Sequence, residues 1–139
     1  MERKFRVLFV CVGNAIRSQM AEAFARSCGS DVLIAGSAGV YPATNIMPLT
    51  RKVLWEKNVD LGDVFPKGIA DHGPQPFDLV VNLSGMTLPA GLKAPVREWN
   101  VKDPMGMKEA AYRGAADQIA QLVQELVLEL RQLREKWRE

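Results

Sequence analysis

The sequence has few of the residues from which metal centres and disulfide frameworks are built. Its 139 residues include only two cysteines, Cys11 and Cys28, and one histidine, His72. Zinc sites need three or four ligands at short paired spacings, and a secreted disulfide framework needs more than two cysteines. We therefore expect no metal site and two reduced thiols, as in a cytoplasmic protein.

Long hydrophobic runs and blocks of one charge are also missing. No apolar stretch approaches the roughly 18 residues of a membrane span, and the run near the N-terminus is too short for a signal peptide. Lysine and arginine together number 18 against 16 acidic residues, which gives a net charge of +2. These absences predict no membrane partner, no nucleic-acid partner and a location in the cytoplasm.

What is present favours a single domain over residues 1–139. Hydrophobic residues make up 47% of the chain and charged residues 24%, which is ordinary for a soluble protein with a sizeable core. Hydrophobic patterns predict strands at 5–10, 32–35, 79–83 and 96–99. They predict helices from 18 to 29, around 50–57, and from 109 onward.

The last helix is predicted to be long. One of its faces carries Tyr112, Ala116, Ile119, Leu122, Val123, Leu126, Leu130, Leu133 and Trp137. Strands that alternate with helices predict an α/β fold with a parallel, doubly wound sheet. In such a sheet the ligand site lies beyond the carboxyl ends of the strands, so the loop after the first strand is the first candidate.

That loop runs from Cys11 to Ser18 and contains a cysteine and an arginine, Arg17, with five residues between them. Because a strand enters it and a helix leaves it, its backbone N–H groups and the helix dipole can converge on one anion. We predict that the oxyanion is bound by the whole loop after the cysteine, namely Val12, Gly13, Asn14, Ala15, Ile16, Arg17 and Ser18.

Within this loop, Arg17 offers a planar fork that matches two oxygens of a phosphate-like ion. The same positive environment favours Cys11 as a reactive thiolate, with Ser18 able to donate to its sulfur. Gly13 and Asn14 suit the positive φ values of a tight curl. Cys28 shares an apolar helix face with hydrophobic residues, so we expect it to be buried and inert.

The segments VLFVCVGN (7–14) and RSQMAEA (17–23) resemble the signature of the low-molecular-weight protein tyrosine phosphatase superfamily. This superfamily includes the arsenate reductases of the same fold. Further matching segments are 37–39, 77–81 and Asp103–Pro104, so the resemblance spans almost the whole chain. It implies a four-stranded parallel sheet flanked by helices.

The resemblance also implies roles for single residues. Cys11 would be the nucleophile, Arg17 the oxyanion clamp and Asp103 the general acid. Ser37 would hydrogen-bond Asn14 and so hold the loop in shape. The local sequence alone gives Asp103 a different role, because an aspartate before a proline is a favoured helix start.

Three departures from the pattern of the superfamily stand out. Met105–Gly106 replaces the aromatic residue that usually follows the Asp-Pro pair of phosphotyrosine-directed members. Ile16 stands where a second loop cysteine is common. Asn82–Met86 lacks the downstream cysteine pair of thioredoxin-linked reductases. The sequence leaves Tyr41 open between a pocket wall and a surface residue, and it favours a surface role for His72.

These observations favour a phosphatase that hydrolyses phosphate monoesters of the phosphotyrosine type through a phosphocysteine on Cys11. Its partner would be a phosphorylated protein or a small phosphate ester. The alternative is an arsenate reductase that uses an external thiol or a glutaredoxin-like protein, and a phosphocysteine carrier ranks third. Neither enzyme would need a metal or another cofactor, because the loop supplies the positive charge.

Overall fold

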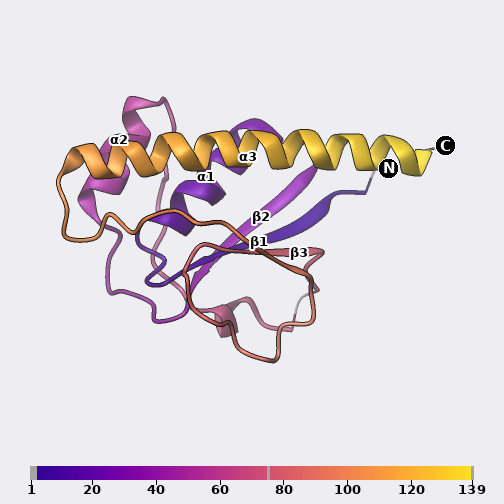
Figure 1. Ribbon diagram of the computed structural model, residues 1–139, viewed down its shortest axis with the longest axis horizontal. Coiled ribbons are helices and arrows are strands. Elements are labelled where there is room, and N and C mark those ends of the chain that lie inside the picture. The colour runs from indigo at the N-terminus through magenta and orange to yellow at the C-terminus, as the bar shows by residue number, and fades with distance from the viewer. Residues whose placement is uncertain (1–2, 75, 139) are drawn as a thin grey trace.

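The computed structural model, which describes residues 3–74 and 76–138, contains one four-stranded parallel sheet (Figure 1). In chain order the elements are β1 (Phe5–Cys11), α1 (Arg17–Gly29), β2 (Leu33–Gly39), α2 (Pro48–Glu56), the 3-10 helix η1 (Ile69–His72), β3 (Leu79–Asn82), β4 (Val96–Glu98) and α3 (Glu109–Arg138). The strand order is β2-β1-β3-β4, and every neighbouring pair is parallel. The predicted fold class is therefore confirmed.

Two elements are longer than their sequence patterns indicate. β2 continues through the small residues Gly36–Gly39, which pair with Leu8–Cys11 of β1. α2 begins at Pro48, because a proline in the first turn gives up no helical hydrogen bond and has the φ value of a helix. The 3-10 helix η1 has no counterpart in the predicted elements.

Alternation along β1 divides the apolar core into two layers. Phe5, Val7, Phe9 and Cys11 belong to the larger cluster, which contains the buried residues of α1, α2 and α3. Leu8 and Val10 point to the opposite face, into a smaller cluster that the half-buried Ile69 of η1 and apolar residues of the loops cover. Figure 1 shows the three α-helices on one side of the sheet and η1 with the loops on the other.

The terminal helix α3 presents the predicted apolar face to the sheet over most of its length. Its buried residues are Tyr112, Ala115, Ala116, Ile119, Val123, Leu126, Val127 and Leu130. Leu133 and Trp137 are exposed, in contrast to the prediction, because the last turns extend past the sheet. The ring of Trp137 still contacts Phe5, with 5.1 Å between the ring centroids.

The prediction that Cys28 is buried was wrong, because its thiol is exposed. Met20, Phe24 and Cys28 follow one another at intervals of four residues, and each interval rotates the side chain by about 40° around an α-helix. Two intervals carry Cys28 away from the buried face. In its place Gly29 faces α3, and a Cβ atom there would lie 2.5 Å from Val127 Cγ2. The thiol of Cys28 has a raised pKa, first because neighbouring atoms partly desolvate it.

The chain leaves β1 toward β2 on one side and returns to β3 on the other. This reversal of direction is the point at which open α/β sheets bind ligands, beyond the carboxyl end of β1. None of the helices in the described ranges is both long enough and apolar enough to span a bilayer.

Candidate active site

The loop between β1 and α1 turns its carbonyl groups outward, toward the segment 40–50. Val12 O accepts from Tyr41 N at 2.8 Å, and Gly13 O accepts from Ala43 N at 2.9 Å. Ala15 O accepts from Met47 N and also from the Thr50 hydroxyl, the latter at 2.9 Å. Because the N–H of a peptide points opposite to its carbonyl, outward carbonyls leave the amides of this loop facing its centre.

The sulfur of Cys11 lies at that centre, and the residue is 3% exposed. Ser18 Oγ lies 2.9 Å from the sulfur, and Asn14 N donates to it at 3.3 Å. The N-terminus of α1, which begins at Arg17, lies beside the same sulfur, so the helix dipole adds positive potential at the centre of the loop. The thiol therefore lies at the centre of a loop whose backbone amides converge on it.

Asn14 holds the curl of this loop. It has a φ of 54°, and its amide oxygen accepts from Gln19 Nε2 and from Lys67 N, both at 3.0 Å. Its amide nitrogen donates to Ser18 Oγ at 2.8 Å. The prediction of a positive φ is confirmed for Asn14 but was wrong for Gly13, which keeps an ordinary backbone conformation.

Ser37 does not reach Asn14, so the hydrogen bond that the resemblance implied is absent. Instead, Ser37 Oγ donates to Glu22 Oε1 at 2.5 Å, and the partners of Asn14 come from Gln19, Ser18 and Lys67. Gln19, in the first turn of α1, is nearer to Asn14 and occupies the acceptor that Ser37 would have to share.

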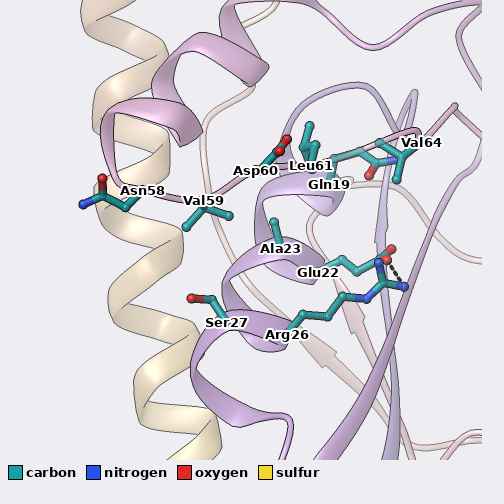
Figure 2. Close-up of a pocket in the computed structure, with 10 residues that line it drawn as sticks. All are labelled: Gln19, Glu22, Ala23, Arg26, Ser27, Asn58, Val59, Asp60, Leu61 and Val64. Atoms are coloured by element: carbon teal, nitrogen blue, oxygen red, sulfur yellow. Dashed lines mark ion pairs between the residues drawn. The ribbon is translucent and has the colours of Figure 1, made fainter.

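Glu22 also pairs with Arg26, one turn further along α1. Figure 2 shows this ion pair at the edge of a cavity of about 240 Å³ between α1 and the segment 58–64. Glu22 itself is 3% exposed, and its carboxyl group is held between Arg26 and the Ser37 hydroxyl. Cys11 is not among the residues that line this cavity.

His72 is half-buried and not the surface residue that the sequence favoured. Its Nε2 lies 2.7 Å from the backbone oxygen of Ser37, and its ring packs edge-on against Phe77. The exposed Tyr41, in contrast, presents its side chain to solvent at the rim of the loop.

Arg17 is buried behind the loop and fixed by two backbone carbonyls. Its Nη1 donates to Leu83 O at 2.5 Å and to Val101 O at 3.0 Å. Its Nη2 lies 3.4 Å from Asp103 Oδ2, on a carboxylate that is 43% exposed. The structure therefore brings Cys11, Arg17 and Asp103, the three residues that the resemblance groups together, to one end of the sheet.

Asp103 does not cap a helix, which rules out the role that its local sequence favoured. The helix α3 begins only at Glu109, and Asp103 Oδ1 accepts from Met105 N at 3.0 Å in a short turn. The turn leaves the second oxygen of the carboxylate toward Arg17.

Several residues of this site were not singled out by the sequence analysis. Gln19, Glu22 and Lys67 gave no separable signal, because they look like ordinary polar helix and loop residues. Asn82 did carry a signal in the sequence, because a polar side chain at the end of a buried parallel strand indicates a ligand site. Among the described residues, no cluster of three or more His, Cys, Asp or Glu could hold a metal ion.

Known proteins and structures are similar to this chain over most of its length. Arsenate reductase 1 of Bacillus cereus is 32% identical over 129 residues, which cover 86% of this chain and 91% of that protein. The glutaredoxin arsenate reductase of Synechocystis is 26% identical, with coverage of 90% and 98%. The crystal structure of arsenate reductase from Archaeoglobus fulgidus matches with 30% identity and a TM-score of 0.78, over 87% of this chain and 98% of that one.

A family comparison covers nearly the whole sequence. Residues 6–138 match the family described as low molecular weight phosphotyrosine protein phosphatase. The match includes the loop from Cys11 to Ser18, the segment after β3 and the Asp103 turn. The chain therefore belongs to the low molecular weight phosphotyrosine protein phosphatase family.

Proposed function

We propose that the protein is an arsenate reductase that uses Cys11 together with an external thiol. The observation that carries the proposal is the description of its relatives. Proteins and structures that are 30% identical or more, over at least 86% of this chain, are described as arsenate reductases. The preferred sequence-based hypothesis, a phosphatase, is therefore second.

In the first step the Cys11 thiolate attacks the arsenic of arsenate. A sulfur–arsenic bond forms and an arsenic–oxygen bond breaks, with arsenic still in the +5 state. The amides of the loop and Arg17 hold the oxygens that remain, and Asp103 supplies a proton so that the departing oxygen leaves as water.

The second step needs another sulfur. An external thiol attacks the Cys11 sulfur, a disulfide forms, and the electron pair of the sulfur–arsenic bond passes to arsenic, which leaves as arsenite. A second external thiol then releases Cys11 from the mixed disulfide. Overall, arsenate and two thiols give arsenite, one disulfide and water.

The chain does not supply the second sulfur itself. Its only other cysteine, Cys28, lies eleven residues after Arg17 in the same helix, about 16 Å along the axis at 1.5 Å per residue. A bond between the two sulfurs would require α1 to unravel. Ser84 and its neighbours after β3 carry no thiol either. The external thiol is therefore an essential co-substrate.

The test measures arsenite and free thiols. Reduced protein is incubated with arsenate alone, and then with added glutathione, mycothiol or a glutaredoxin. We expect arsenite only with added thiol, no Cys11–Cys28 disulfide by mass spectrometry, full activity in Cys28→Ser and none in Cys11→Ser. Absence of arsenite with every thiol donor contradicts the proposal.

Phosphate ester hydrolysis is the second candidate. The observation that favours it is the match of residues 6–138 to the family described as low molecular weight phosphotyrosine protein phosphatase. In this reaction Asp103 would protonate the leaving group of the ester. The same preparation is assayed with p-nitrophenyl phosphate and no thiol. Turnover that needs no co-substrate, without any arsenite formation, would favour the phosphatase over the reductase.

A further inference from the structure

One of the two carbonyls that hold Arg17 belongs to the peptide group that joins Leu83 to Ser84. The carbonyl of this peptide accepts from Arg17 Nη1 at 2.5 Å. Its N–H, on Ser84, donates to Asn82 Oδ1 at 3.0 Å. One planar group therefore links the buried guanidinium to the side chain of Asn82, and a rotation of that plane breaks both bonds.

Asn82 has a partner for every donor and acceptor of its amide. Its oxygen accepts from the N and from the hydroxyl of Ser84, and its nitrogen donates to Met86 O at 2.8 Å and to the Glu98 carboxylate at 3.0 Å. These partners fix which way the amide faces, because a carbonyl and a carboxylate only accept and a backbone N–H only donates. The side chain is 2% exposed.

Glu98 reaches Asn82 because of the register of the sheet. Asn82 ends β3, and Glu98 is its partner on the neighbouring strand β4. Glu98 is exposed, so its carboxylate is a charged acceptor at the edge of the sheet, aimed at a buried amide. A charged acceptor makes this hydrogen bond stronger than a neutral one would be.

We propose that Asn82 is a positioning residue for oxyanion binding, and that Glu98 sets the orientation of its amide. Asn82 contacts no substrate. It holds the Leu83–Ser84 peptide with its carbonyl toward Arg17, which leaves the other nitrogens of the guanidinium directed at the oxyanion. The inference rests on the proposed function only in assigning Arg17 as the clamp.

Loss of the amide has a defined consequence. Without Asn82 the Ser84 N–H is buried with no acceptor, so the peptide turns to find one and its carbonyl moves away from Arg17. The guanidinium then loses one of its two backbone acceptors and keeps only Val101 O and the exposed Asp103 carboxylate as partners. We expect oxyanion affinity to fall about 10-fold, which is the effect of one net hydrogen bond of about 1.4 kcal/mol.

The test measures dissociation constants for inorganic phosphate and arsenate by calorimetry, in a Cys11→Ser background that cannot turn over. Asn82→Ala is expected to weaken both ions about 10-fold and Glu98→Ala about 3-fold. Glu98→Gln keeps an acceptor and restores most of the affinity. Thr87→Ala, exposed in the same loop, is the matched control and leaves affinity unchanged.

The number of binding sites per protein molecule, which calorimetry also measures, shows whether Asn82 positions Arg17 or only stabilises the fold. If Asn82 only stabilises the fold, Asn82→Ala lowers the fraction of protein that binds but leaves its dissociation constant unchanged, and that result overturns the inference. If Asn82→Ala does not fold, the proposal is tested by Glu98→Ala and Glu98→Gln instead. Equal affinity of these two variants for phosphate and arsenate contradicts the proposal. If the Cys11→Ser parent binds neither ion, the proposed function fails as well.

Discussion

Arg17 and Asp103 face each other across the entrance of the loop, with 3.4 Å between Nη2 and Oδ2. Arg17 is buried whereas the carboxylate of Asp103 is well exposed. An arriving oxyanion therefore meets a guanidinium that already has an anionic partner, on a residue that can turn away into solvent. The same carboxylate is then placed beside the oxygens of the bound ion.

Replacing Asp103 by asparagine removes the proton donor and the negative charge together. We expect Asp103→Asn to lower kcat by about 10²–10⁴, because general acid catalysis contributes that much. Oxyanion affinity should rise, since Arg17 loses its anionic partner. Steady-state rates with saturating thiol and calorimetry with phosphate check the two effects. A small loss of rate with a lower Tm would instead assign Asp103 to the turn at Met105 alone.

Gly39, at the end of β2, is expected to tolerate no side chain. A Cβ atom there would lie 2.8 Å from Val12 O and 2.9 Å from Asn14 N, which are backbone atoms of the loop between β1 and α1. Gly39→Ala should therefore displace the loop and abolish turnover and phosphate binding together. Gly91→Ala, where a Cβ atom meets nothing within 4 Å, is the control. Normal phosphate affinity in Gly39→Ala would contradict the prediction.

Gly29 and Gly114 offer a matched pair for stability. A Cβ atom at Gly29 would collide with Val127 Cγ2 at 2.5 Å, so Gly29→Ala should destabilise the protein by about 1–3 kcal/mol. Gly114 lies inside α3 with open space around it, so Gly114→Ala should stabilise by about 0.5–1 kcal/mol. Urea unfolding measures both. If both substitutions changed the free energy of unfolding in the same direction, the packing of α1 on α3 would be contradicted.

The ion pair of Asp31 with Arg131 predicts a pH dependence of stability. The hydrogen bonds from Arg131 lower the pKa of the Asp31 carboxyl below its ordinary value. As the pH falls, the Asp31 carboxylate of the unfolded chain is protonated before that of the folded protein. The ion pair therefore stabilises the fold fully above the ordinary pKa of aspartate, and this stabilisation is lost as the pH falls toward the lower pKa of the folded protein. Asp31→Asn should be less stable than the parent at pH 6, with a smaller difference at pH 3. An equal difference at both values in urea titrations would contradict this.

The sequence predicted the elements whose signal is local. The apolar run before Cys11, the change to helical spacing after Arg17 and the long apolar face of α3 each follow from period and composition. For the same reason the loop from Cys11 to Ser18 could be identified, since strand, curl and helix follow one another directly in the chain.

What the sequence could not provide were contacts between distant segments. Asn14 takes its partners from Gln19 and Lys67 instead of Ser37, because the packing of α1 decides which side chain is nearest. The exposure of Cys28 depends on where α3 crosses Gly29, a contact with Val127 at the other end of the chain. Neither relationship has a periodic signature.

Strand β1 comes first among the four strands, yet it lies in the middle of the sheet. One of its neighbours, β3, follows only after α1, β2, α2 and η1. Pairing that waits for such distant partners slows folding. During synthesis, one edge of the apolar strand β1 therefore stays unpaired until β3 has been made. The chain is most prone to aggregation in the interval before α3 covers the sheet.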